Sequence, residues 1–288
     1  MKRALLVINP RSGKGRAPSV VQIAQRIAPT HGYDLETRSI EGHGHGKELA
    51  MEAVRNGISL VIVAGGDGTL NSIASGLLGS DVALGIVAMG SGNGYARSLC
   101  LPLDAEAALH RAFTGEKKRM DICFLNDMPF LGTAGIGFDA RVAYRFDKSK
   151  SRGMLGYAKI IFQEILGTPP MHVTGEVHSE RIDDDVLMVV FCNTREFGNG
   201  AVISPGSRPD DGLAEIRVVR KPSFFPLIKA FIQIYTHKAD KSEYIRNLVA
   251  TEATIQQSGT LAHLDGEPVE VGNVVRFRLE KERLWVVV

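Results

Sequence analysis

Short apolar runs that end in glycine-rich loops recur along the first third of the chain. These runs are residues 4–8, 60–64 and 83–88. Continuous apolar runs of this length are typical of strands that are buried on both faces of a parallel sheet. Helical patterns lie between them, at residues 18–28, 47–55 and 70–78. The alternation predicts an α/β fold with an open, doubly wound sheet, in which ligands bind at the carboxyl ends of the strands.

The pattern changes near residue 120. Strand-like runs then follow one another at residues 120–125, 186–191, 214–219, 274–279 and 284–288. Turn residues separate them, among them Asn126-Asp127, Asp210-Asp211-Gly212 and Asp265-Gly266. This spacing predicts antiparallel pairing. We therefore expect two domains, an α/β domain at residues 1–122 and a β-rich domain at residues 123–278, with a C-terminal strand at 279–288 that returns to the first domain.

Composition limits the classes of partner. The chain has 34 basic and 32 acidic residues, a net charge of +2. A nucleic-acid-binding protein normally shows a basic face or stripe, so we expect no nucleic acid partner. Three cysteines are too few for a disulfide framework and favour reduced thiols in a cytoplasmic protein. No apolar run approaches the ~20 residues that span a bilayer, so we expect membrane contact to be peripheral.

The loop after residues 60–64 reads Gly65-Gly66-Asp67-Gly68-Thr69. Glycines let the backbone approach phosphate groups and present N–H groups to them. We expect Thr69 to cap the next helix, whose N-terminus attracts anions. Asp67 adds a carboxylate to a loop shaped for phosphate, which indicates a bridging Mg²⁺. The alternative is a tight strand-to-helix turn in which Asp67 is an incidental cap.

Two further glycine loops follow neighbouring strands. One is Asn9-Pro10-Arg11-Ser12-Gly13-Lys14, and the other is Gly90-Ser91-Gly92-Asn93-Gly94. Neither matches the P-loop or the G-x-G-x-x-G dinucleotide fingerprint, which disfavours a Rossmann dehydrogenase. Because the carboxyl ends of parallel strands meet at one edge of a sheet, we expect the three loops to converge on one crevice.

The three loops resemble those of the diacylglycerol kinase catalytic-domain family, which includes bacterial diacylglycerol kinases and sphingosine and ceramide kinases. The resemblance extends through later motifs, which are Met120-Asp121-Ile122, residues 134–140, Gly198-Asn199-Gly200, residues 210–213 and residues 264–267. It implies a nucleotide-binding domain of the NAD kinase and phosphofructokinase type, and a β-rich antiparallel sandwich domain that takes a lipid. It also implies an active site between the domains and a cytoplasmic enzyme of phospholipid metabolism.

The resemblance assigns roles to single residues. It implies that Asp265 is the general base that takes the proton from a lipid hydroxyl while ATP donates its γ-phosphoryl group, although Asp-Gly is also a strong hairpin turn pair. It implies that Asp67, also catalytic, and Asp121 hold the catalytic Mg²⁺. The residues that it places around the nucleotide are Asn9, Ser12, Gly13, Lys14, Gly65, Gly66, Gly68, Thr69, Ser91, Gly92, Asn93 and Glu267.

Two positions depart from the family pattern. Gly94 stands where many bacterial members have Asp, and it contributes no charge. Pro205-Gly206-Ser207 offers no acidic ligand ahead of the Asp-Asp-Gly motif. Asp210 and Asp211 are therefore left with two interpretations, a structural Mg²⁺ site and a solvated turn.

A basic run includes Arg141, Arg145, Lys148, Lys150 and Arg152. It is interpreted either as a solvated helix end or as a contact for lipid headgroups or ATP phosphates. Two apolar helical stretches, residues 154–166 and 224–234, are core elements or, alternatively, walls of an acyl-chain cleft.

The leading prediction is an ATP-dependent lipid kinase that acts on a lipid presented at a membrane surface. A kinase of a soluble substrate, such as an NAD kinase, shares the G-G-D-G loop but does not account for the motifs at residues 134–140 and 264–267. A non-catalytic lipid- or nucleotide-binding regulator stays open because of Gly94. The sequence specifies neither the lipid nor the oligomeric state, a homodimer included.

Overall fold

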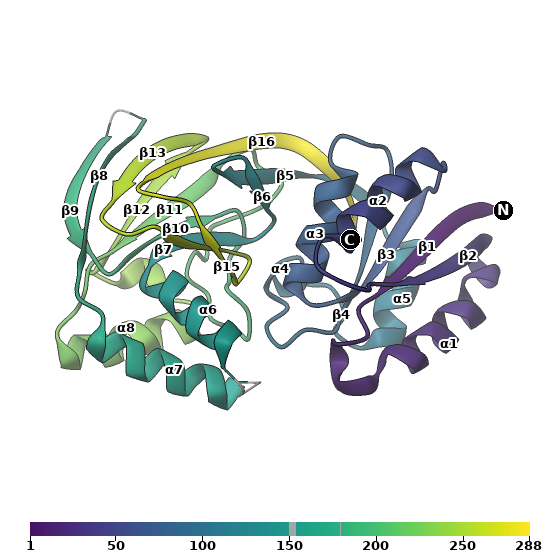
Figure 1. The fold of residues 1–288 in the computed structure, drawn as a ribbon, viewed down its shortest axis with the longest axis horizontal. Helices are drawn as coiled ribbons and strands as arrows, with labels where there is room; N and C mark the ends of the chain where they lie inside the picture. The colour runs from purple at the N-terminus through teal and green to yellow at the C-terminus, as the bar shows by residue number, and fades with distance from the viewer. Residues whose placement is uncertain (150–153, 179) are drawn as a thin grey trace. The chain divides into compact units, whose positions relative to one another are not determined.

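The computed structural model describes residues 1–149, 154–178 and 180–288 (Figure 1). The chain divides into two compact units. Unit 1 comprises Met1–Met120 and Lys281–Val288, and unit 2 comprises Asp121–Glu280.

Unit 1 contains a parallel sheet, as the alternating pattern predicts. Its strand order is β2 (Tyr33–Ser39), β1 (Lys2–Ile8), β3 (Leu60–Gly65), β4 (Ala83–Ala88) and the end of β16 (Val274–Val287). In register, Leu6 of β1 lies opposite Thr37 on one side and Ile62 on the other. All six residues of β3 and of β4 are buried, which explains why these strands read as unbroken apolar runs.

Helices cover both faces of this sheet (Figure 1). On one face, α1 (Ala17–Ile27) and α5 (Ala105–Thr114) enclose a core that includes Leu6, Ile62 and Leu109. On the other, α2 (His45–Arg55) packs against α3 (Asp67–Leu77). Gly76 allows these two helices to approach, since a Cβ there would lie 2.5 Å from the Lys47 carbonyl oxygen. The short helix α4 (Gly94–Ser98) follows β4.

Unit 2 contains antiparallel strands in two sheets, which confirms the β-rich second domain. One sheet has the order β16, β13 (Glu252–Gln257), β8 (Met171–Val177) and β9 (Glu180–Val186), with β5 (Lys117–Leu125) and β6 (Met128–Phe130) off this path. The other has the order β12 (Ile245–Ala250), β11 (Ala214–Val219), β10 (Met188–Cys192), β7 (Thr133–Gly137), β14 (Leu261–Leu264) and β15 (Glu267–Glu270).

Strand β10 shows how unit 2 builds two apolar layers. Alternate side chains point to opposite faces of a strand. Val189 and Phe191 join the core of the sandwich, where the Phe191 ring stacks on Phe277 with 5.1 Å between centroids. Val190 and Cys192 face the other way, into a core shared with helical residues.

Three helices cover the outer side of the second sheet: α6 (Phe138–Lys148), α7 (Met154–Gly167) and α8 (Phe224–Tyr235). Phe138 of α6, Ile160 of α7 and Ile234 of α8 pack in this outer core. Within the apolar stretches at residues 154–166 and 224–234, Ile160 and Ile234 are therefore core residues. Of the helices in the described ranges, none combines the length and apolarity needed to cross a bilayer.

Two predicted strands differ in the structure. Residues 186–191 were expected to form one strand, but the chain passes from β9 in one sheet to β10 in the other at Leu187. Both strands are buried there, so the apolar run continues through the change of sheet. Residues 274–279 and 284–288 were expected to be separate, but they belong to the single strand β16. Charged residues at 280–283 and a left-handed Glu282 (φ 53°) interrupt its apolar pattern.

The sandwich core yields a stability prediction. Phe191 is fully buried, so Phe191→Ala should lower the free energy of unfolding by about 3–5 kcal/mol. Phe162, which is 62% exposed, provides the matched control, and Phe162→Ala should change it by less than about 0.5 kcal/mol. Denaturant titration followed by circular dichroism measures both. Equal effects of the two changes would contradict the assignment of Phe191 to the core.

Candidate active site

The loops after β3 and β4 meet backbone to backbone. A Cβ on Gly66 would lie 3.2 Å from the Gly90 Cα, and a Cβ on Gly90 would lie 2.7 Å from the Gly66 Cα. The Met89 N–H donates to the Gly65 carbonyl oxygen at 2.8 Å and continues the strand pairing into the loops. A side chain at Gly90 would therefore force the loops apart, and one at Gly66 would need a smaller shift of the Gly90 backbone.

The loop after β1 joins the same cluster. The Asn9 side-chain amide donates to Thr69 Oγ1 at 2.8 Å, and the Asn9 backbone N–H donates to the Ala64 carbonyl oxygen at 3.0 Å. Gly13 has a left-handed φ of 75°, and a Cβ there would lie 2.4 Å from the Met89 Cε. The three glycine loops thus lie together at one edge of the sheet, as predicted.

Thr69 does not cap α3, contrary to the expectation from sequence. Helix α3 begins at Asp67, and its N-cap is Gly66 in an extended conformation. Thr69 is therefore the third residue of the helix, and its hydroxyl accepts the Asn9 amide instead. With Gly66 as its N-cap, the helix starts three residues earlier than it would with Thr69 as the cap.

Asp67 stands at the first position of α3 and faces the start of α4. Burial raises the pKa of its carboxyl group, while hydrogen bonds from the backbone N–H groups of Asn93, Gly94 and Tyr95 act in the opposite direction. Asn93 is itself fixed, because its side-chain oxygen accepts the Gly90 N–H at 2.8 Å. The carboxylate is thus held by backbone dipoles of the neighbouring loop.

The other residues predicted around the nucleotide are distributed along the same loops. Ser12 precedes the 3₁₀ turn Gly13–Gly15, which contains Lys14, whose side chain lies outside the described part of the chain. Gly68 is the second residue of α3, and Ser91 and Gly92 lie in the loop before α4. A cavity of about 10 Å³ lies among Gly66, Asp67 and Asn93. That volume accommodates a single water, so a nucleotide would have to lie on these loops and not inside them.

Asp265 lies in unit 2, in the two-residue turn between β14 and β15. Asp265 and Gly266 both have left-handed φ values, of 50° and 86°. The Asp265 carboxylate accepts three backbone N–H groups at the start of β7 and just before it: Oδ2 from Leu131 at 2.8 Å, and Oδ1 from Gly132 at 2.7 Å and Thr133 at 3.1 Å. Glu267 is the first residue of β15 and is exposed. The turn therefore projects a carboxylate whose orientation is fixed by the neighbouring strand.

Asp121 is buried on β5 and binds the Asp-Asp-Gly turn. Its Oδ2 accepts the Gly212 N–H at 2.6 Å. Within the turn, Asp211 Oδ1 accepts the Leu213 N–H at 3.0 Å, and Asp210 lies 3.3 Å from Arg208 Nε. The Asp210 and Asp211 carboxylates thus contact residues of the turn and its immediate neighbours in sequence.

The described residues contain no group of three His, Cys, Asp or Glu side chains that could hold a metal ion. Mg²⁺ in kinases is commonly held by one or two carboxylates together with substrate phosphates, and not by a complete protein cage. Of the two predicted ligands, Asp67 offers one carboxylate at the start of α3, whereas Asp121 is buried on β5 and its Oδ2 accepts the Gly212 N–H.

A buried asparagine links the two acidic positions of unit 2. The Asn193 side-chain amide donates to the Asp121 carbonyl oxygen at 3.0 Å and to the Leu131 carbonyl oxygen at 2.7 Å. Its backbone N–H donates to the Gly132 carbonyl oxygen at 2.9 Å. Asn193 could not be predicted from the sequence, because nothing in its local pattern distinguishes it from any residue after a buried strand.

Sequence analysis also missed a histidine beside the Asp265 turn. His263 Nε2 lies 3.1 Å from Asp139 Oδ2, although the two residues are 124 positions apart. One signal was present, since His263 and Asp265 are two residues apart at the end of a strand.

Glycine loops at the carboxyl edge of a parallel sheet, followed by an antiparallel sandwich that fixes a carboxylate in a turn, are the arrangement expected of a two-domain phosphotransferase. Comparison with known proteins agrees. Residues 3–125 match the diacylglycerol kinase catalytic domain, and residues 132–286 match the YegS C-terminal NAD kinase beta sandwich-like domain. The chain belongs to the lipid kinase family that these two domains define, whose members are ATP-dependent phosphotransferases.

Relatives match over almost their whole length. A protein of Klebsiella pneumoniae (strain 342) named "Probable lipid kinase YegS-like" is 28% identical, over 96% of this chain and 92% of its own. The protein named "Diacylglycerol kinase" in Bacillus subtilis (strain 168) is 26% identical, over 93% and 90%. A crystal structure of a diacylglycerol kinase from Bacillus anthracis str. Sterne has a TM-score of 0.75 at 19% identity, over 99% and 96%, which shows a shared fold.

The raised pKa of Asp67 yields a prediction about stability. The folded protein binds this proton more tightly than the unfolded chain, so the free energy of unfolding falls as pH rises from the ordinary value of 3.8 through the raised pKa of the folded state. Asp67→Asn should therefore increase stability at neutral pH, and the gain should shrink as pH falls toward the ordinary range.

Urea titrations at several pH values measure this difference, with Asp34→Asn as the control because Asp34 is exposed on β2. A loss of stability in Asp67→Asn at neutral pH would contradict this prediction.

Proposed function

We propose that this protein transfers the γ-phosphoryl group of ATP to a hydroxyl group of a membrane lipid of the diacylglycerol or sphingoid type. The observation that carries the proposal is the Asp265 carboxylate, which a two-residue turn projects and three backbone N–H groups orient. The names of the relatives, lipid kinase and diacylglycerol kinase, support a lipid as the acceptor.

The nucleotide is assigned to unit 1. Gly66 and Gly90 place partly exposed backbone at the edge of the sheet, where N–H groups can bind phosphate oxygens. The N-terminus of α3 adds a favourable dipole for anions. Mg²⁺, held by Asp67 together with the phosphates, would supply positive charge to the transferred group.

The proposed reaction needs one proton acceptor. Asp265 takes the proton of the lipid hydroxyl as that oxygen forms a bond to the γ-phosphorus. The bond from the γ-phosphorus to the bridging oxygen of ADP breaks, and ADP leaves with that oxygen. The three N–H donors keep the carboxylate in one orientation, so little reorganisation is needed when the proton moves.

Asp265→Asn tests this role. A general base contributes about 10²- to 10⁴-fold, so kcat for lipid phosphorylation should fall by that factor, while ATP binding to unit 1 persists. Transfer of label from γ-labelled ATP to lipids in mixed micelles, separated by chromatography, measures the loss. Asp127→Asn is the matched control, because Asp127 is also a left-handed hairpin residue and is exposed.

The same assay separates the competing functions when NAD is offered beside the lipids. Labelled NAD without labelled lipid would assign a soluble substrate. ATP binding without a labelled product from any acceptor would support a non-catalytic regulator. The unfolding midpoint of Asp265→Asn must be measured as well. In this variant an amide nitrogen faces the Leu131 N–H, and the loss of that hydrogen bond can lower the stability of the protein.

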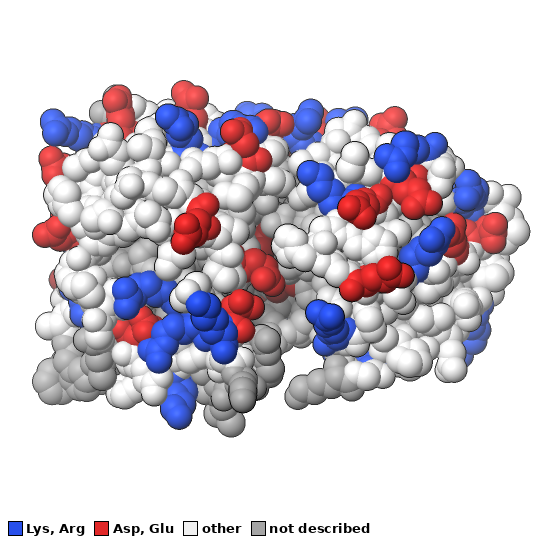
Figure 2. All heavy atoms as spheres, in the orientation of Figure 1, with Lys and Arg blue, Asp and Glu red and all other residues white. Residues whose placement is uncertain are grey.

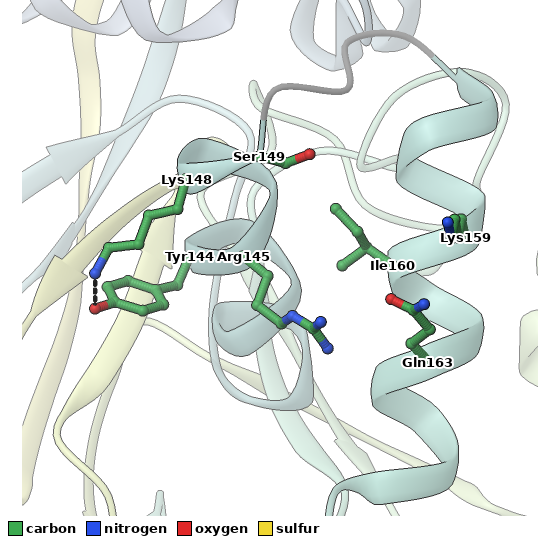
Figure 3. A pocket seen from close by; sticks show the side chains of 7 residues that line it. All are labelled: Tyr144, Arg145, Lys148, Ser149, Lys159, Ile160 and Gln163. Carbon is green, nitrogen blue, oxygen red and sulfur yellow. Dashed lines mark hydrogen bonds between the residues drawn. The ribbon is translucent and has the colours of Figure 1, made fainter.

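We further propose that unit 2 contacts the membrane through the groove between α6 and α7. The groove encloses about 450 Å³ and is lined by Tyr144, Arg145, Lys148, Ser149, Lys159, Ile160 and Gln163 (Figure 3). Arg145, Ile160 and Gln163 point into the space between the helices, while Lys148 lies against Tyr144 (Figure 3). Basic side chains gather over α6 and α7 on this face (Figure 2). Lys150 and Arg152 of the predicted basic run lie outside the described residues.

The charges of this groove favour an anionic partner. Three of its lining residues are cationic and none is acidic. Glu164 lies beneath, and although burial opposes its ionisation, Arg145 and Arg141 outweigh burial and lower its pKa. One carboxylate thus faces two guanidinium groups. Phe162, on the same helix as Lys159, is 62% exposed and offers an apolar contact beside the cations.

Vesicle binding tests the groove. Each basic residue near an anionic surface adds about 1 kcal/mol, so Lys148→Ala with Lys159→Ala should weaken binding to phosphatidylglycerol vesicles about thirtyfold. Vesicles of phosphatidylcholine alone should show no difference. Lys117→Ala with Lys118→Ala, which removes two exposed charges of unit 1, is the control. Equal losses in both double variants would show that net charge alone causes the effect. They would refute the proposal that the groove contacts the membrane.

A further inference from the structure

His263 contacts the turn that carries Asp265. Its Nδ1 atom accepts the Gly266 N–H at 3.3 Å. The imidazole ring is buried, on the opposite face of β14 from Ala262 and Leu264, which belong to the sandwich core. His263 therefore reaches the turn from the side of the sheet that α6 covers.

Asp139, the second residue of α6, fixes the ring. Its Oδ2 lies 3.1 Å from His263 Nε2, while its Oδ1 accepts the Ala140 N–H at 2.9 Å. Since Nδ1 accepts a hydrogen bond, the proton of the neutral ring is on Nε2, which donates to Asp139. The hydrogen-bond pattern thus defines both the tautomer and the orientation of the ring.

Gly135 makes room for this pair. It lies opposite His263 across the β7–β14 ladder. A Cβ at Gly135 would lie 1.8 Å from Asp139 Oδ2 and 3.0 Å from His263 Nε2. The Phe197 ring packs against the imidazole, with 6.1 Å between centroids in an edge-on arrangement. The pair thus lies between Gly135, where a side chain would collide with it, and the Phe197 ring.

The contacts form a continuous chain from α6 to Asp265. Asp139 orients His263, His263 holds the Gly266 N–H, and Gly266 follows Asp265 in the turn. On the opposite side of the turn, the carboxylate accepts the N–H groups of residues 131–133. Asp265 is a left-handed non-glycine residue, a conformation that persists when its surroundings hold it.

We propose that His263 and Asp139 are positioning residues that hold the Asp265 turn in the geometry required for proton transfer. Neither touches the reacting atoms in this scheme, and both act through the turn. The effect on turnover rests on the proposed function, whereas the effect on the turn does not. These two parts can therefore be tested separately.

Two substitutions at position 263 separate hydrogen bonding from packing. His263→Asn keeps an acceptor where Nδ1 lies, while His263→Leu fills similar space without one. Because a small displacement of a reacting group can cost about 100-fold, kcat should fall about 10- to 100-fold in His263→Leu and only a few-fold in His263→Asn. The KM for ATP should stay unchanged in both, since the nucleotide loops belong to unit 1. His172→Leu, at an exposed position on β8, is the control.

Hydrogen exchange of single amides, followed by NMR, gives a readout without turnover. The Gly266 amide should exchange faster in His263→Leu and stay protected in His263→Asn. This pattern in a protein that phosphorylates no lipid would support the positioning role of His263 and refute the proposed function. Unchanged exchange and kcat in His263→Leu would overturn the inference, and so would equal losses in both variants, because the acceptor would then be irrelevant.

Discussion

The backbone contact between Gly66 and Gly90 is the constraint on which the edge of the sheet in unit 1 depends. Neither position tolerates a Cβ without displacing the other loop. Because the loops meet without side chains, α3 starts immediately after β3, and the start of α4 approaches Asp67. The edge of the sheet therefore presents backbone groups in fixed positions. Phosphate oxygens bind well to such groups, since the N–H dipoles are oriented before any ligand arrives.

The acidic residues of the candidate site follow a common design. Asp67 accepts N–H groups of residues 93–95, Asp121 accepts that of Gly212, and Asp265 accepts those of residues 131–133. Backbone N–H groups orient a carboxylate without neutralising it as a full positive charge would. The positions of these side chains are thus determined by strands and turns.

Unit 1 could be predicted from the sequence because its signals are local. Buried parallel strands are apolar at every position, and the glycine loops follow them directly. The same uniformity concealed the change of sheet at Leu187, where two buried strands read as one. In β16 the effect was opposite, since the charged residues 280–283 made one strand read as two. The pair of His263 and Asp139 could not be predicted, because strand pairing brings together residues that share no local pattern.

Strand β16 has a consequence for the order in which the chain folds. It pairs with β13 in unit 2, and its residues Trp285 and Val286 pair in parallel with β4 in unit 1. During synthesis these residues leave the ribosome only after all of unit 2 has been made. Unit 1 therefore lacks its fifth strand until unit 2 has been synthesised. Domains usually fold in the order of synthesis, and this order is reversed for the last step. Until that step, β4 remains an exposed sheet edge, open to pairing with other chains in the crowded cell.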